Sequence, residues 1–142
     1  MLLAVNGTLM RGLEMNQNLV EVGGAFIRVA RTAPLYRLWS INDQYPAMLR
    51  VNGGGAPILL EIWEISQNGL VSVVENEPPG LTLGFVSLED GSRVLGILAE
   101  PFILEGMAEI TSYGDWRIYI EHSSLASAQR ADDGGAGVRK KP

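Results

Sequence analysis

The chain has 142 residues, 46% of them hydrophobic and 19% charged, which suffices for one domain with its own core. It has no cysteine and one histidine, His122, which excludes thiolate chemistry, disulfides and cysteine-based metal sites, and allows a Ser-His-Asp triad only with His122 as base. Both lysines, Lys140 and Lys141, lie within the last three residues, so a Schiff-base, cofactor-anchoring or phosphate-loop lysine is excluded from the remainder of the chain.

The charge is unevenly distributed. Residues 1–122 carry seven arginines against fourteen Asp and Glu, whereas residues 123–142 carry four basic and two acidic side chains. The excess of acidic residues in 1–122, which we term the body of the chain, argues against nucleic-acid binding, because a phosphate backbone needs a sizeable basic surface. No apolar run approaches the roughly 20 residues of a membrane span, and the apolar start lacks a basic leader. We therefore expect no membrane contact and a cytoplasmic protein.

Most of the hydrophobic patterning is typical of strands. Apolar residues lie on both faces of 58–65 around Glu61, which indicates a central strand. A Glu-Asp-Gly turn ending at Gly91 predicts a hairpin, with Gly91 supplying a positive φ. The expected strands are 2–5, 25–33, 36–41, 58–65, 82–88 and 93–99.

Helices are fewer, and Ser66 is a plausible N-cap for the second of them. The segment 123–142 is small, polar and rich in glycine, so it cannot bury enough apolar surface to offset its ordering entropy and we predict that it is disordered. One domain over residues 1–122, of the α+β class, follows from many short strands and few helices. The expected helices are 16–22, 68–75, 101–106 and 116–122.

The first candidate site is the loop that follows the first strand. That strand ends in Asn6-Gly7-Thr8-Leu9, a sharp turn that can leave successive backbone N–H groups pointing into one space. Such a group of donors holds a carboxylate or an oxyanion. A glycine turn with a purely structural role is the alternative interpretation.

The second candidate is a pair of carboxylates, Glu75 and Glu77, before Pro78 and Pro79. A glutamate held beside a cavity wall by this rigid step would have its pKa raised by apolar neighbours and could act as a general base. A helix that simply ends with solvated glutamates is the alternative.

The third candidate is the aromatic segment 112–119. Tyr113 and Arg117 are candidate substrate-binding residues, since Arg117 can pair with Asp115 or with a substrate carboxylate. Packing of a closing segment against the domain is the competing interpretation. His122, at the edge of the tail, is expected to be solvated.

Taken in chain order, these pieces resemble the γ-glutamylcyclotransferase-like superfamily. The resemblance covers residues 1–122 and implies a mixed β-barrel with a few short helices. The similar segments are Asn6-Gly7-Thr8-Leu9-Met10 (the family's Tyr-Gly-Ser-Leu), Tyr45-Pro46-Ala47-Met48 (Tyr-Pro-Ala), Glu61-Ile62-Trp63 (Gly-Glu-Val-Tyr), Glu77-Pro78-Pro79-Gly80 (a glutamate at a helix end) and Gly114-Asp115-Trp116-Arg117 (the C-terminal segment).

A closer resemblance is to the C-terminal domain of allophanate hydrolase, over residues 5–13, 30–38 and 113–119. The amidase domain that normally precedes it, with Ser-Ser-Lys chemistry, is not in this sequence. The resemblance therefore implies a free-standing relative of this domain. The amidase mechanism is not available to such a relative.

If cyclotransferase chemistry carries over, the α-amino group of a γ-glutamyl amine attacks its own γ-carbonyl, which gives 5-oxoproline and releases the amine. Glu77 would serve as base and then as acid, and the N–H groups of Gly7, Thr8 and Leu9 would hold a carboxylate or the oxyanion. No metal or cofactor is implied. Two departures are that Asn6, a predicted substrate-binding residue, replaces the family's tyrosine, and that the surroundings of Glu77 are more proline-rich than the family's Glu-Gly-Tyr. Glu75 competes with Glu77 for the catalytic role.

Two further hypotheses stay open. The allophanate hydrolase resemblance implies decarboxylation or other processing of a small carboxylated urea derivative. A role without catalysis is the second, either binding of a small carboxylate or amide metabolite or service as a dimerising accessory to a separate amidase. A homodimer about a two-fold axis is compatible with a domain this small.

Overall fold

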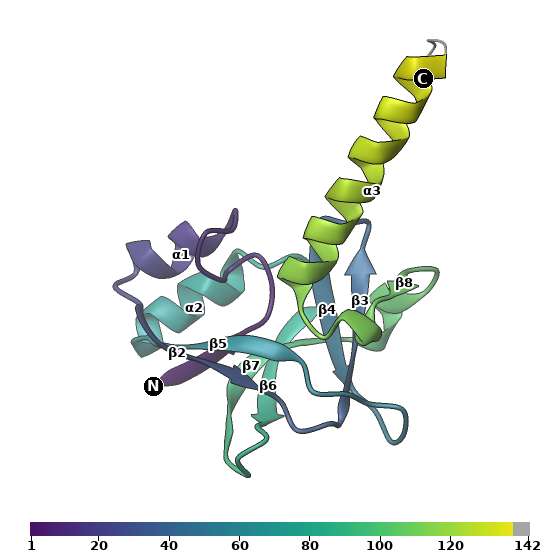
Figure 1. Cartoon of the computed structure of the whole chain (residues 1–142). Helices are drawn as coiled ribbons and strands as arrows, with labels where there is room; N and C mark the ends of the chain where they lie inside the picture. The colour runs from purple at the N-terminus through teal and green to yellow at the C-terminus, as the bar shows by residue number, and fades with distance from the viewer. Residues whose placement is uncertain (138–142) are drawn as a thin grey trace.

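The computed structural model describes residues 1–137, with side-chain surroundings described to residue 126 (Figure 1). The elements in chain order are β1 Leu2–Val5, α1 Asn16–Glu21, β2 Ala25–Arg31, β3 Tyr36–Ile41, β4 Tyr45–Arg50, β5 Leu59–Glu64, α2 Gln67–Glu75, β6 Leu81–Ser87, β7 Arg93–Ala99, the 3-10 helix η1 Pro101–Leu104, β8 Ala108–Glu109, the 3-10 helix η2 Thr111–Tyr113, and α3 Trp116–Gly137.

The strands form two sheets. Five of them follow the order β2-β5-β1-β7-β6, and three follow the order β4-β3-β8. Strand β1 pairs parallel with β7, and the other ladders are antiparallel, so the first sheet is mixed. The expected mixed α+β fold is confirmed, but the described strands lie in two sheets and form no closed barrel. Pro34 lies between β2 and β3, where the chain leaves the first sheet, and it cannot donate to a ladder.

The core lies between the sheets and under two helices. Strand β5 is central, paired with β1 on one side and β2 on the other, as its two apolar faces indicate. Helices α1 and α2 pack side by side on the five-stranded sheet (Figure 1), and they bury Leu19, Leu70 and Val73 in the main hydrophobic cluster. These contacts hold the loop after β1 and the end of α2 against the same sheet.

Local signals for turns and caps are confirmed. The Ser66 hydroxyl accepts a hydrogen bond of 3.0 Å from the N–H of Gly69 and caps α2. Gly91 has φ +90° in the hairpin that joins β6 and β7. Both features depend on residues close in sequence, which is why the pattern predicts them.

Strand β4 was not expected from the sequence because Pro46 interrupts its pattern. Pro46 pairs with Ser40 in the ladder between β3 and β4, and β4 is an edge strand of its sheet. An edge strand tolerates a residue that cannot donate a ladder hydrogen bond. The two-residue strand β8 is too short to produce an alternating pattern.

Helix α3 continues to Gly137 and projects away from the two sheets (Figure 1). The predicted disorder from residue 123 therefore differs from the structure as far as residue 137, while residues 138–142 lie outside the described part. Asp115 caps the helix, since its Oδ1 accepts a 2.8 Å hydrogen bond from the N–H of Arg117. The helix continues to Gly137 through a segment that contains Ala, Ser, Gln and Arg residues. The division at residue 122 stays a prediction.

Within the described residues, no helix is long and apolar enough to cross a membrane.

Candidate functional site

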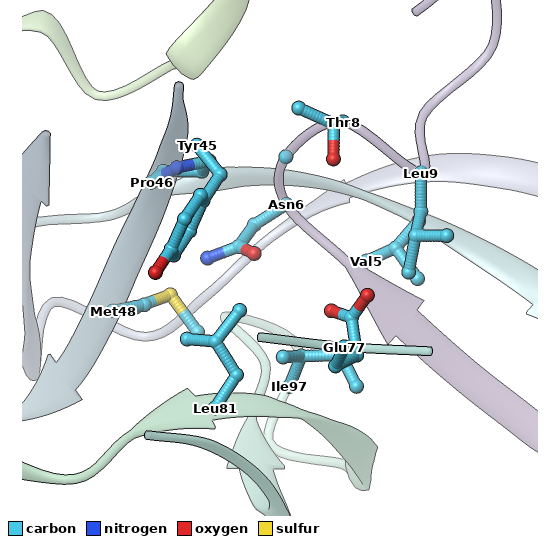
Figure 2. Close-up of a pocket in the computed structure, with 11 residues that line it drawn as sticks. Val5, Asn6, Thr8, Leu9, Tyr45, Pro46, Met48, Glu77, Leu81 and Ile97 are labelled. Carbon is cyan, nitrogen blue, oxygen red and sulfur yellow. The ribbon is translucent and has the colours of Figure 1, made fainter. Parts of the chain in front are cut away.

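A hollow lies where the loop after β1 faces β4 and the segment that follows α2 (Figure 2). This inner hollow has a volume of about 20 Å³, which admits about one water-sized group. A wider outer hollow of about 270 Å³ shares Thr8, Tyr45, Glu77 and Leu81 with it, so the two adjoin. The inner hollow is lined by Val5, Asn6, Gly7, Thr8, Leu9, Tyr45, Pro46, Met48, Glu77, Leu81 and Ile97.

Gly7 lets the loop approach β4 closely. A Cβ atom at this position would lie 2.6 Å from both Cγ and Cδ of Pro46, a distance that real Cβ contacts do not show. Only glycine lacks this atom, so the loop and the proline ring can touch. The contact forms one wall of the inner hollow.

Hydrogen bonds within the loop turn its carbonyl groups away from solution. The carbonyl oxygen of Gly7 accepts from the N–H of Met10 at 2.9 Å, and that of Thr8 accepts from the N–H of Met15 at 2.9 Å. In residues 1–137, no acceptor is recorded for the N–H groups of Gly7, Thr8 and Leu9. The convergence of these N–H groups on one space, and their role in binding, stay predictions.

Glu77 lies at the hollow, and Glu75 does not. Helix α2 ends at Glu75, whose side chain is exposed, whereas Glu77 is half-buried and its carboxylate points toward Thr8 and Leu9 (Figure 2). Burial raises the pKa of Glu77 to about 7, because the charged form loses water. Near neutral pH this carboxyl both holds and releases a proton.

Tyr45 faces Glu77 across the hollow. Burial, followed by the negative charge of Glu77, raises the pKa of the Tyr45 hydroxyl above its ordinary value of 10.0. Tyr45 therefore keeps its proton at neutral pH. From the residues alone Tyr45 was not predicted as a site residue; only its place in the Tyr-Pro-Ala segment signals it.

Asn6 is a further polar side chain of the inner wall. It is 7% exposed, and its Nδ2 atom has no hydrogen-bond acceptor among the described residues. Buried side-chain donors in folded proteins are nearly always paired, so this atom needs an explanation.

The described residues indicate no metal centre. No group of three or more His, Asp or Glu side chains in residues 1–137 is placed to hold a metal ion. Of the described residues, those that line the two hollows include Glu14 and Glu77 but no arginine, lysine or histidine. A ligand here would be held by N–H and hydroxyl donors and by apolar walls.

Arg117 lies elsewhere, in a cluster that we term the Glu61 clamp: Glu61, Arg11, Trp63 and Arg117. Glu61 is fully buried and accepts hydrogen bonds from the N–H of Arg11 at 3.0 Å, from Arg11 Nε at 3.1 Å and from Trp63 Nε1 at 3.1 Å. Arg117 Nη2 lies 3.8 Å from the same carboxylate and donates to the carbonyl of Arg11. The clamp ties the loop after β1 to β5 and α3. A glutamate with apolar residues on both sides in the strand, Glu61, was its sequence signal.

Tyr113 also lies outside the two hollows. Its ring packs edge-on against Tyr119 at 5.2 Å, and its hydroxyl lies 3.1 Å from Nδ1 of the exposed His122. The structure thus brings Glu77 together with Asn6, Gly7, Thr8 and Leu9, but not with Tyr113 or Arg117. Substrate contact by these last two residues stays a prediction that our proposal does not use.

The start of α3 also supports the site. The Tyr119 hydroxyl donates a 2.6 Å hydrogen bond to Asp43, and together with the Ser40 hydroxyl it lowers the pKa of that carboxyl. Asp43 has φ +59° in the turn that leads into β4. Helix α3 therefore helps to hold the turn that precedes Tyr45 and Pro46.

A family model for the allophanate hydrolase C-terminal domain matches residues 1–121. The chain belongs to this family. Its structure is similar to that of c4763, a uropathogenic E. coli-specific protein. The two are 53% identical, with a TM-score of 0.83 over 85% of this chain and 95% of that one. Allophanate hydrolase of Kluyveromyces lactis is 29% identical with a TM-score of 0.81, over 85% of this chain and 21% of that chain.

Two curated relatives, both urea amidolyases, are much longer proteins. Urea amidolyase of Saccharomyces cerevisiae is 26% identical over 135 residues, which are 90% of this chain and 7% of that protein. The chain thus spans a small part of such relatives, within which the matching segment is one domain of a larger enzyme.

The fold also resembles that of an AIG2-like (ggact) protein of Mus musculus, with a TM-score of 0.55 and 22% identity over 73% of this chain and 82% of that one. At this identity the likeness concerns the fold alone. It confirms the γ-glutamylcyclotransferase-like architecture that the resemblance implies.

Proposed function

We propose that this domain acts on a small carboxylated urea or amide and that Glu77 delivers a proton to the substrate nitrogen as an N-carboxyl group leaves. The observation that carries the proposal is the placement of Glu77, half-buried at the wall of the hollow, with a pKa of about 7. A general acid works best when its pKa lies near the operating pH. Relatives are named for allophanate, which is an N-carboxylated urea.

The reaction needs little from the protein besides this proton. The bond between nitrogen and the carboxylate carbon breaks, its electron pair stays on nitrogen, and the carboxylate leaves as neutral CO₂. Nitrogen takes the proton of the Glu77 carboxylic acid, which becomes a carboxylate and is reprotonated by water. No thiol, lysine or histidine is required, in keeping with a body that lacks cysteine and lysine.

The negative charge of the proposed substrate supports an acid role for Glu77. An anionic substrate beside Glu77 disfavours the carboxylate form and raises its pKa further, so the bound substrate itself keeps the proton in place. The outer hollow, at about 270 Å³, lies just below the roughly 300–1,000 Å³ of pockets for drug-sized ligands. A small metabolite fits this volume.

A second candidate is cyclisation of a γ-glutamyl amine to 5-oxoproline. Glu77 lies just beyond the end of α2, as in the γ-glutamylcyclotransferase-like superfamily, and a pKa of about 7 also suits a general base. In that reaction the carboxylate form of Glu77 must take a proton from the attacking ammonium. The two candidates therefore need opposite protonation states of one residue.

The pH dependence of turnover separates the two. We expect CO₂ release from allophanate above the rate with heat-inactivated protein, with kcat/KM, which reports the free protein, falling about tenfold per pH unit above pH 7 as Glu77 loses its proton. Cyclotransfer would instead fall below pH 7, with 5-oxoproline formed from a panel of γ-glutamyl amines. A Glu77→Gln variant that keeps the full rate in both assays would overturn both candidates.

A further inference from the structure

We infer that Asn6 is a specificity-determining residue whose side-chain amide donates a hydrogen bond to an sp² oxygen of the ligand in the inner hollow. The inference rests on the proposed function for the identity of the substrate, but it concerns binding and needs no turnover. The observation behind it is an unpaired donor, since Asn6 Nδ2 is buried without an acceptor among the described residues.

The fold offers this donor no partner of its own. The amide nitrogen points to the side of the hollow formed by Tyr45 and Met48 (Figure 2), yet it forms no hydrogen bond with the described residues. The Tyr45 hydroxyl could accept but is not hydrogen-bonded to it, and the thioether of Met48 is only a weak acceptor. The rest of the inner wall near the amide is apolar, with Val5, Leu81 and Ile97. A buried donor without a partner destabilises the folded protein, so an apolar residue of similar size would serve the fold better.

The donor selects the chemical class of the ligand. An amide N–H binds an oxygen acceptor and offers nothing to an ammonium group. The inner hollow of about 20 Å³ admits one group of oxygen size, such as a carbonyl or carboxylate oxygen. A deeper or bulkier substituent does not fit beside Asn6.

Asn6 and Glu77 together suit an O=C–N unit. The two residues line the same hollow, and the carboxylate of Glu77 points to the opposite side from the Asn6 nitrogen (Figure 2). An amide, urea or carbamate presents its acceptor oxygen and its nitrogen from one carbon atom. With the oxygen at Asn6, the nitrogen is directed toward the proton of Glu77.

The binding test uses small probes and NMR of the Asn6 side-chain amide. Acetamide supplies an O=C–N unit, acetate supplies a carboxylate, and methylammonium supplies neither. We expect the Asn6 amide resonances to shift on titration with acetamide and acetate but not with methylammonium. The same shifts should persist in Glu77→Gln, so a failed proton-transfer mechanism stays distinguishable from a failed binding inference. Asn6 resonances that stay fixed with every probe would overturn the inference.

The variant test compares stability with binding. Asn6→Leu removes the unpaired donor, so we expect an unchanged or higher Tm together with at least a tenfold loss of acetamide and acetate binding. Asn6→Asp replaces a donor by an acceptor and should also lose binding, whereas Asn68→Asp on the exposed surface of α2 should not. A lower Tm for Asn6→Leu with binding retained would show that the amide serves the fold, and would contradict our inference.

Discussion

Glu61 lies in the middle of β5, Glu77 lies two residues beyond α2, and both carboxylates are held among apolar side chains. Glu61 is fully buried and accepts three hydrogen bonds from Arg11 and Trp63, with Arg117 alongside. Glu77 is half-buried, and no donor among the described residues reaches it, so burial alone raises its pKa to about 7. Burial without hydrogen-bond donors raises the pKa of a carboxyl group, as at Glu77, whereas at Glu61 three donors replace the lost water.

The largest expected effect is on turnover. Glu77→Gln keeps the shape of the side chain but cannot exchange a proton, so we expect kcat to fall by about 10²–10⁴-fold, the range for loss of a general acid or base. The measurement is steady-state CO₂ release from allophanate. Glu75→Gln is the matched control, because Glu75 is exposed and should keep the full rate. Equal losses in both variants would contradict the distinction between the two glutamates.

Glu61→Gln should instead reduce stability. The amide cannot accept all the hydrogen bonds that Arg11 and Trp63 donate to the carboxylate, and hydrogen bonds to charged groups are worth about 1.5–3 kcal/mol each. We expect the free energy of unfolding, measured by urea denaturation, to fall by about this amount. Glu64→Gln, on the exposed side of the same strand, should change it little. An unchanged midpoint for Glu61→Gln would show that the clamp contributes nothing to stability.

The stability of the domain should depend on pH through Glu77. Its pKa is raised from 4.5 to about 7 on folding, so the folded state binds more protons than the unfolded state between these values. Stability from this group is present below pH 4.5 and is lost as pH rises toward 7 and above, by about 1–3 kcal/mol once partial exposure to solvent is considered. Urea denaturation across this window should show the slope in the native protein and lose it in Glu77→Gln. A slope that survives in Glu77→Gln would assign the effect to another group.

The smallest expected effect concerns the loop that joins the two glutamate environments. Gly7→Ala places a Cβ atom 2.6 Å from the Pro46 ring, so the loop or β4 must shift, at a cost of at least about 1 kcal/mol in thermal or urea unfolding. Gly53→Ala is a suitable control, because nothing lies within 4 Å of its Cβ position. Pro46→Ala in the Gly7→Ala background should restore part of the loss. If it does not, the contact between loop and ring is not the cause.

Features that depend on neighbouring residues could be predicted from the sequence. The cap at Ser66, the turn at Gly91 and the central position of the strand around Glu61 follow from hydrogen bonds and patterns within a few residues. Strand β4 could not, because the tolerance of Pro46 depends on its place at a sheet edge. The continuation of α3 to Gly137 could not be predicted either, because the small, polar, glycine-containing segment offers too little apolar surface to indicate order.

The candidate site also has features that the sequence predicts and features that it does not. The loop from Asn6 to Leu9 and the Glu-Pro-Pro step each carry a local signal, so they were predicted. The choice of Glu77 over Glu75 depends on which carboxylate faces the sheet, and the pairing of Arg117 with Glu61 joins residues 56 positions apart, as their numbers show. No local pattern contains either relation.

The sequence by itself determined the available chemistry. A body without cysteine or lysine, with one histidine at its edge, leaves carboxylates, hydroxyls and amides as the groups that can act. Only the tertiary structure decided which carboxylate lines the hollow with a raised pKa, because the pKa of a side chain depends on the water and donors that the fold removes or supplies around it. Packing of α2 and the loop after β1 on one sheet reduces the hydration of Glu77. At Glu61, hydrogen-bond donors of the Glu61 clamp take the place of water.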